Sequence, residues 1–267
     1  LSLNSAYGAL GSQYFRFYDL RMALGVTTAG QLSIRWIENK LNEYINKILK
    51  TNNDYVIASD TDSIYLNLGP LVDKFVPSGK SVDEVIGIMD QICMDKIEPF
   101  IDRSYLELAD YVHAYQQKMQ MKREALANKG IWTGKKHYIL NVYNNEGVQY
   151  KQPKLKVMGL EMVKSSTPIA IRAKMKDVID ILINGTEDDV QKFIKTFREE
   201  FKTLPIEDIS FPRGVSNLTK YYDPVTLYRK STPIHVKGAI LYNHYIKEYK
   251  LDKKYPQINE GEKLKYV

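Results

Sequence analysis

Asp60 and Asp62 stand one residue apart between two short apolar runs, residues 55–58 and 64–66. This pattern predicts a β-hairpin that carries the two aspartates at or near its turn. Carboxylates on such a rigid tip suit magnesium, which prefers oxygen ligands and can hold substrate phosphates during phosphoryl transfer. A two-metal site needs a further carboxylate from elsewhere in the chain, and Glu124, on a candidate strand, is one possibility. The same pattern is also typical of an Asp-rich turn whose side chains bond their own backbone.

A second group lies at the start of the chain, where Asn4, Tyr7 and Gly8 follow helical spacing and share one helix face. A glycine on that face lets another molecule approach closely, and a tyrosine can lie flat against a base pair. The alternative is an ordinary helix with one buried tyrosine and a glycine of no special role.

A third group consists of Lys135, Lys136, His137 and Tyr138. Alternation along a strand places Lys136 and Tyr138 on one face, with Lys135 and His137 on the other. Lysines on a strand can hold phosphates, or reach the minor-groove acceptors that every base pair presents. A strand edge that lysine protects against aggregation is the other interpretation.

Positive charge is concentrated around this third group. The whole chain has a net charge of +6. Residues 118–176 contain 13 Lys or Arg and 3 Glu, a local net charge of +10. Tyr138, Tyr143 and Tyr150 interleave with these lysines on strand-like segments, so the pattern favours a surface that binds a polyanion over a merely solvated one.

Several classes of protein and site are not expected. Cys93 is the one cysteine, so no internal disulfide can form, which suits a reducing compartment. No apolar run of about 18 residues is present, so no membrane span is expected. Residues 79–81, Gly-Lys-Ser, resemble the end of a P-loop, but Lys74 stands where its first glycine should be. The four histidines lack metal-ligand spacing with Cys93, so no zinc site is expected.

The elements that must position these groups are a mixture of helices and strands. Residues 1–25 are expected to be helical, and Thr27 or Thr28 is expected to cap a second helix that runs to about residue 50. Ser81 with Glu84 makes a capping box for another helix. One more helix is expected at 103–117. Strands are expected at 121–126, 138–142 and 148–150, with a hairpin turn at 144–147. A further strand at 154–162 is expected to extend this sheet.

The pattern changes near residue 164. Thr167 and Pro168 mark the start of a helix that ends at residues 184–185, and Thr186 caps the next one. Residues 231–233 repeat the cap-then-proline signal. We therefore predict an α+β fold, in which a mixed domain with an antiparallel sheet and packed helices is followed by a mostly helical domain.

With these segments placed, the chain resembles the C-terminal part of the family B DNA polymerases, and most closely the replicative enzymes of T-even-type bacteriophages. Residues 4–8 match the N-S-x-Y-G end of the family's fingers-helix motif. Residues 60–63 match the end of its Y-G-D-T-D-S palm motif, and residues 135–138 match its K-K-R-Y motif. The likeness to the phage type is strongest in P-K-L-K-V-M-G-L-E at 153–161 and K-S-S-T-P at 164–168.

This resemblance implies a DNA-directed DNA polymerase that adds deoxynucleotides to a primer 3′ end with two magnesium ions. It implies that residues 1–25 end the fingers helix, residues 26–163 form the palm and residues 164–267 form part of the thumb. Asp62 is then the metal-ligating aspartate, with Asp60 and Glu124 as neighbouring catalytic acids. The implied nucleotide-binding residues are Asn4, Tyr7 and Gly8, and the implied DNA-binding residues are Lys135, Lys136, His137, Tyr138, Lys156 and Lys164.

The implied partners are primer-template DNA, deoxynucleoside triphosphates and an N-terminal polymerase part, on the same chain or on a separate subunit, in the cytoplasm of an infected host cell. Some residues depart from the family pattern. Ala58-Ser59 replace the Tyr-Gly before D-T-D-S, and His137 replaces an arginine, which exchanges a fixed charge for a titratable one.

The fingers-motif lysine falls one position before Leu1, and the family's other metal-binding aspartate lies in an earlier motif outside the chain. We therefore interpret the N-terminus as a cut or a gap in the sequence, and expect the chain alone to be inactive. Two other hypotheses stay open. One is a non-catalytic DNA-binding module, and the other is a structural subunit that completes a partner's fold, which an exposed apolar surface around residues 1–25 would support.

Overall fold

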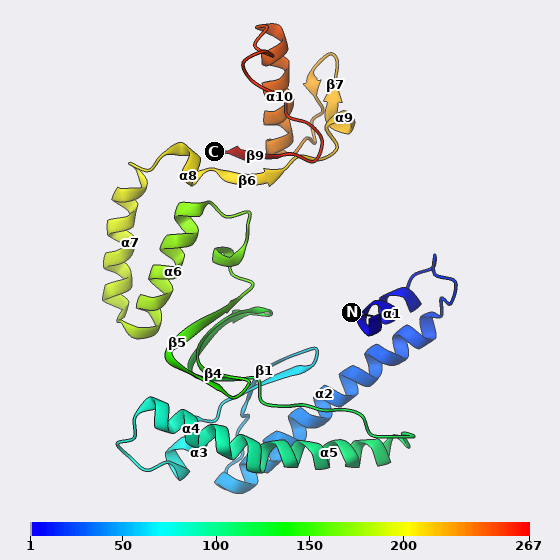
Figure 1. The fold of residues 1–267 in the computed structure, drawn as a ribbon, viewed down its shortest axis with the longest axis vertical. Helices are drawn as coiled ribbons and strands as arrows, with labels where there is room; N and C mark the ends of the chain where they lie inside the picture. Colours follow the sequence, from blue (N-terminus) through cyan, green and yellow to red (C-terminus); the bar gives the residue numbers. More distant parts are fainter. Residues whose placement is uncertain (1) are drawn as a thin grey trace. The chain divides into compact units, whose positions relative to one another are not determined.

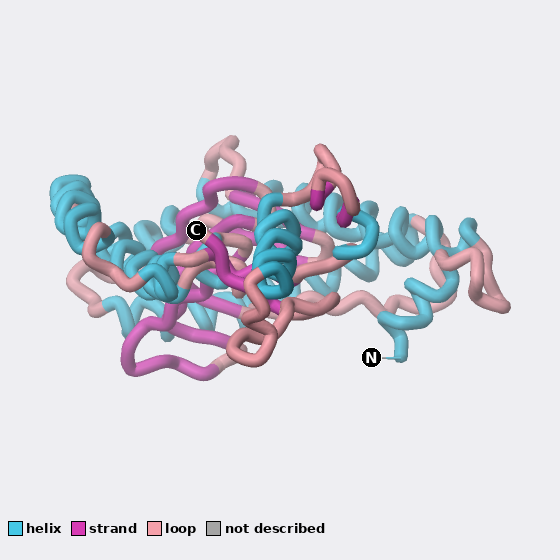
Figure 2. The backbone as a smooth tube through the Cα atoms, turned by 90° about the horizontal axis from the view of Figure 1, so that it is seen from above, coloured by secondary structure: helices cyan, strands magenta, loops and turns pink. Residues whose placement is uncertain are grey.

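A computed structural model describes the backbone of residues 2–267 and the side chains from Ser5 onward. The chain divides into two compact units. The first unit comprises Leu1–Gly130 with Leu140–Lys156, and the second comprises Ile131–Ile139 with Val157–Val267. Each unit has its own apolar core. Helices, cyan in Figure 2, make up most of the regular structure, and small sheets accompany them, so the predicted α+β class is confirmed.

The first unit is built on helices. In chain order these are α1 (Ser2–Leu10), α2 (Leu20–Leu49), α3 (Gly69–Phe75), α4 (Val82–Ile92), the π-helical turn η1 (Cys93–Ile97) and α5 (Glu98–Tyr111). The long helix α2 carries the core stripe, because Ile37, Leu41 and Ile45 recur every four residues and are fully buried. In Figure 1, α5 lies at an angle to α2 and meets its C-terminal half, and the indole of Trp36 ties the two helices by donating to the carbonyl of Ser104 at 2.8 Å.

The prediction for the first two helices was wrong in detail. α1 ends at Leu10, and α2 begins at Leu20 and continues through Gly25 and Thr27 without a break. Asp19 is the actual cap, since its carboxylate accepts from the backbone N–H of Arg21 at 2.9 Å. The hydroxyl of Thr27 instead donates to the carbonyls of Ala23 and Leu24 inside the helix.

Other boundaries also moved. The helix expected at 103–117 is α5, which starts at Glu98 directly after η1 and ends at Tyr111. The capping box of Ser81 and Glu84 is confirmed at the start of α4. Hydrogen bonds from Lys80 and from Ser81 hold the pKa of the Glu84 carboxyl at about 2.

Two sheets belong to the chain's first 158 residues. β1 (Val56–Asp60) and β2 (Ser63–Leu66) form the predicted antiparallel hairpin, with Asp60 opposite Ser63. β3 (Ala125–Gly134), β4 (His137–Asn145) and β5 (Val148–Met158) form a three-stranded sheet in that order. The predicted turn at 144–147 is confirmed, and Glu146 and Gly147 both take positive φ there, as a tight hairpin requires. The strand expected from residue 121 starts only at Ala125.

The second unit is mainly helical after residue 158. Its elements are η2 (Glu161–Val163), α6 (Ile169–Asn184), α7 (Glu187–Phe201), α8 (Ile206–Ile209), β6 (Phe211–Gly214), α9 (Leu218–Tyr221), β7 (Tyr222–Asp223), β8 (Leu227–Tyr228), α10 (Ile234–Glu248) and β9 (Lys263–Tyr266). Thr186 caps α7 as predicted, with Asp189 completing the box. Thr167 does not cap α6, since Pro168 is the residue at that position. None of the helices within residues 2–267 is both long enough and apolar enough to cross a membrane.

Candidate functional site

The β1–β2 hairpin presents the two predicted aspartates at its tip. Thr61 sits at a φ of 56°, and the backbone N–H of Asp62 donates to the carbonyl of Asp60 at 2.7 Å, which closes a tight turn. The Asp60 carboxylate accepts from the hydroxyl of Thr61 at 3.0 Å. Asp62 is exposed, and its carboxylate accepts no hydrogen bond and joins no ion pair within the described residues. The turn is therefore closed by backbone and hydroxyl groups, which leaves the Asp62 carboxylate available.

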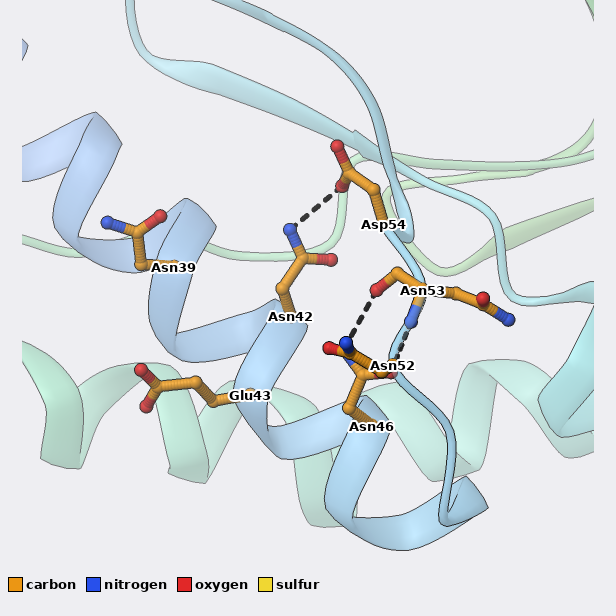
Figure 3. A pocket seen from close by; sticks show the side chains of 7 residues that line it. All are labelled: Asn39, Asn42, Glu43, Asn46, Asn52, Asn53 and Asp54. Carbon is orange, nitrogen blue, oxygen red and sulfur yellow. Dashed lines mark hydrogen bonds between the residues drawn. The ribbon is translucent and has the colours of Figure 1, made fainter.

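The segment leading into this hairpin is tied to α2 by two asparagines one helical turn apart. Figure 3 shows Asn42 beside Asp54 and Asn46 beside Asn53. Asn42 donates to the Asp54 carboxylate at 2.8 Å and accepts from the N–H of Tyr55 at 2.7 Å. Asn46 bonds both the carbonyl and the N–H of Asn53, each at 2.8 Å. These hydrogen bonds fix the position of the start of β1, and hence the position of the hairpin, relative to α2.

The same asparagines line a shallow hollow of about 530 Å³ on the first unit. Its lining consists of polar side chains from α2 and from the segment after it: Asn39, Asn42, Glu43, Asn46, Asn52, Asn53 and Asp54. None of the predicted site residues lines this hollow, and we assign no ligand to it.

Glu124 and Lys156, which were predicted separately as a catalytic acid and a DNA contact, form an ion pair. The ammonium of Lys156 on β5 donates to the Glu124 carboxylate at 2.5 Å. The side chain of Lys156 is 33% exposed and that of Glu124 is 57% exposed, so the pair lies at the surface. Sequence reasoning missed this pairing because the partners are 32 residues apart, and no local pattern links them.

Oxygen donors of the kind that magnesium prefers are present, but they do not converge. Among the residues that the structure describes, no three His, Cys, Asp or Glu side chains are grouped so that they could hold a metal ion. The hairpin tip offers Asp60 and Asp62, whose hard carboxylate oxygens fit magnesium chemically. Glu124 instead pairs with Lys156. A complete metal site therefore needs further ligands from waters, from a substrate phosphate or from another polypeptide segment.

The basic group at 135–138 spans the turn between β3 and β4. Lys135 and Lys136 lie in the turn, and His137 and Tyr138 begin β4, which corrects the prediction that Lys136 and Tyr138 share a strand face. β3 ends at Gly134, β4 begins at His137, and Lys136 has a φ of 60°. The ring of His137 shares a hydrogen bond with the carbonyl of Lys135 at 2.7 Å. Tyr138 is only 8% exposed and packs at 6.2 Å from the ring of Trp132, so in this conformation its ring does not face solvent.

The remaining predicted residues lie apart along the chain. Lys164 directly follows η2 and pairs with Glu161 at 2.7 Å. Tyr7 is exposed on α1, and the space around the α-carbon of Gly8 is open, as a close approach by a ligand requires. The side chain of Asn4 lies outside the described residues.

Comparison with known proteins gives consistent relatives. A family model described as Divergent Family B DNA polymerase matches residues 32–197. The DNA-directed DNA polymerase of Escherichia phage RB69 is 40% identical over 99% of this chain and 30% of its own length. The DNA-directed DNA polymerase of Enterobacteria phage T4 is 37% identical over 91% of this chain and 28% of its own length. DNA polymerase 1 of Aeropyrum pernix is 22% identical over 90% of this chain.

The chain thus spans about 30% of the length of the phage relatives that it matches. The family model covers the hairpin with Asp60 and Asp62, the Glu124–Lys156 pair and the basic turn at 135–138. More than half of the chain lies within that match, and both phage relatives align over nearly all of it. The chain therefore belongs to the divergent family B DNA polymerases.

Proposed function

We propose that this chain supplies part of the active site of a DNA-directed DNA polymerase, which adds deoxynucleotides to a primer 3′ end. The observation that carries the proposal is the exposed and unpaired carboxylate of Asp62 at the tip of a tight hairpin. A carboxylate held in a tight turn between two paired strands and free of internal hydrogen bonds is preorganised to bind a cation. An Asp-rich turn that satisfied its own backbone would have used that carboxylate internally.

Each residue has a proposed role. Asp62 binds magnesium, Asp60 supports it from the neighbouring position, and Glu124 is an acid close to the metals. Two magnesium ions, when bound, stabilise the attacking and leaving oxygens of the phosphoryl transfer. The proposed nucleotide contacts are Asn4, Tyr7 and Gly8, and the proposed DNA contacts are Lys135, Lys136, His137, Tyr138, Lys156 and Lys164.

The proposed assignment of the chain is fingers end at 1–25, palm at 26–163 and thumb at 164–267. The proposed setting is the cytoplasm of an infected host cell, with primer-template DNA and deoxynucleoside triphosphates as substrates. Because the chain spans about 30% of its phage relatives, we propose that activity needs the polymerase part that those relatives carry outside the aligned region.

A primer-extension assay tests this function. The chain is combined with a polypeptide that carries the part of the phage relatives lying outside the aligned region, in saturating magnesium and nucleotide. Extension is expected from the mixture and from neither component alone. A mixture that forms a complex and yet extends no primer would contradict the proposal.

A second candidate is a structural subunit that completes a partner's fold. An exposed apolar stretch favours it: Tyr14, Phe17, Leu20, Met22, Leu24 and Val26 are each more than half exposed, apart from any core. Isolated apolar side chains are ordinary on a surface, and such residues mark an interaction site where they form one contiguous patch. Under this hypothesis the partner binds equally well after Asp62→Asn.

A further inference from the structure

Arg123, the residue before Glu124, is anchored by groups from three distant segments. Its guanidinium pairs with the carboxylate of Asp90 on α4, and it also donates to the side-chain oxygen of Asn144 at 3.1 Å. Asn144 in turn donates to Asp90 at 3.2 Å, which closes a triangle. The side chains of Arg123 and Asp90 are only 10% and 16% exposed, and Asn144 is 2% exposed.

The backbone of Arg123 is held as well. Its N–H donates to the carboxylate of Glu98, the first residue of α5, at 3.0 Å. Asp90 and Glu98 are eight residues apart, which in a regular α-helix places them about 80° apart around the axis. The π-helical turn η1 lies between them and adds one residue to the turn, which reduces this separation to about 20°. The two carboxylates can therefore face Arg123 together, and the irregular turn is what aligns them.

These contacts define the position of Glu124. Its carbonyl oxygen accepts from the N–H of Glu146 at 2.6 Å and from the guanidinium of Arg123 at 3.2 Å. Its carboxylate extends outward to the ammonium of Lys156. Glu124 is thus fixed through its main chain, next to the buried polar cluster of Arg123, Asp90 and Asn144, while its side chain is 57% exposed.

We propose that Arg123 is a positioning residue for Glu124: locked between Asp90 and Asn144, it sets the backbone from which the Glu124 carboxylate reaches Lys156. A planar guanidinium can bond two partners at fixed angles, which the point charge of lysine cannot do. Burying an ion pair contributes little to stability compared with apolar packing, so its presence fits a requirement for geometry. The inference rests on the proposed function only for what Glu124 does, and not for where it is held.

Amide hydrogen exchange in the purified chain tests the positioning directly. The N–H of Glu146 reports on the Glu124 carbonyl that it bonds. Arg123→Lys keeps the charge and removes the two-partner geometry, and exchange of the Glu146 N–H is expected to become about tenfold faster or more. Amides in the buried part of α2 should exchange at the rate of the unaltered chain. Arg103→Lys, an exposed arginine on α5, is the matched control and should change neither.

Asp90→Asn is the second variant, since it keeps the shape of the side chain and weakens the same anchor. It should accelerate exchange at Glu146 in the same selective way, though by a smaller factor. The proposal is overturned if the Glu146 N–H keeps its exchange rate in both variants, or if every amide of the first unit accelerates equally.

Primer extension by the complete polymerase then asks whether the positioning matters through Glu124. Arg123→Lys should raise the magnesium concentration for half-maximal extension about threefold or more, and should have no further effect in a Glu124→Gln background. Equal losses in both backgrounds would show that Arg123 only stabilises the fold. If exchange accelerates selectively at the Glu146 N–H and primer extension does not change, Arg123 holds the backbone of Glu124 in place, but the catalytic role proposed for Glu124 is wrong.

Discussion

Gly159 is the residue that lets the basic turn at 135–138 take its shape. It has a φ of 71°, a conformation that side chains with a Cβ rarely adopt. A Cβ at this position would overlap the carbonyl oxygen of Lys136 and would lie 3.0 Å from the ring of His137. The glycine thus allows the chain after β5 to pass directly against the turn that carries the lysines.

Gly159→Ala should therefore destabilise the second unit by about 1–3 kcal/mol, because both the strained φ and the overlap must be relieved. Urea unfolding followed by fluorescence measures this change. Gly134→Ala is the matched control, since Gly134 ends β3 beside the same turn, does not have a positive φ, and has open space where its Cβ would lie. Equal losses of stability in the two variants would argue against this role of Gly159.

Cys93 makes a pH-dependent contribution to the unfolding free energy, and this contribution can be separated from those of other groups. Its thiol is buried in η1, and burial raises its pKa from 9.0 to about 11. The unfolded chain loses this proton near pH 9 and the folded chain retains it, so the stability that the thiol contributes is present below pH 9 and is lost as pH rises towards 11.

The difference in unfolding free energy between the unaltered chain and Cys93→Ala should accordingly shrink by about 1–3 kcal/mol between pH 8 and pH 11. Urea unfolding of both proteins across this pH range measures it, and other titrating groups cancel in the difference. A difference that stays constant would mean that the thiol has the same pKa in the folded and unfolded chains, and one that grows with pH would mean that its pKa is lower in the folded chain.

Among the elements, the lead into β1 shows how side chains on one helix define the start of a hairpin. The backbone after α2 turns at Lys50, which has a φ of 59°. The side chain of Asn46 then bonds Thr51 as well as both backbone groups of Asn53. The segment is exposed, so these hydrogen bonds hold it in place, whereas apolar burial holds other parts of the unit.

Asn46→Ala should cost about 1–2 kcal/mol, because three hydrogen bonds are exchanged for bonds to water. Thermal or urea unfolding measures the loss, and amide exchange in residues 51–55 should increase with it. Asn39 lines the same hollow and makes no hydrogen bond among the described residues. The unfolding free energy of Asn39→Ala should therefore stay within about 0.5 kcal/mol of that of the unaltered chain. If the Asn39 variant were the less stable of the two, the tether would not be the cause.

Local signals predicted many of these elements and failed at others for physical reasons. The capping box at Ser81, the cap at Thr186 and the turn at 144–147 depend on neighbours within four residues, and they were confirmed. The start of α2 was misplaced because Thr27 has the chemistry of a cap but bonds back into its own helix. The π-helical turn at 93–97 has no sequence signature that we could use.

At the scale of the whole molecule, the partners that organise the candidate site come from far along the chain. Glu124 pairs with Lys156, and Asn144 bonds Asp90, 54 residues away. Sequence patterns identified Asp62, Glu124 and Lys156 as candidates, but the pairing depends on how strands and helices pack. The apolar stretch at 14–26 likewise became visible only once its exposure was known.

Several of the basic residues in the positively charged region also pair with carboxylates of the chain. Of the 13 Lys or Arg in residues 118–176, at least Arg123, Lys156, Lys164 and Lys174 pair with carboxylates. Part of the positive charge in this region is therefore balanced by carboxylates of the chain itself and attracts a polyanion less strongly. This explains why a count of lysines alone overstates the surface available to nucleic acid.

The proposed function depends most on Asp62 as a metal ligand, and one measurement tests this role directly. Primer extension is compared for Asp62→Asn and for Asp73→Asn, an exposed aspartate on α3, in the complemented polymerase over a range of magnesium concentrations. If Asp62 binds the metal, Asp62→Asn should lose at least about a hundredfold in extension rate at saturating magnesium, and Asp73→Asn should lose none. Equal extension rates for the two variants would contradict it.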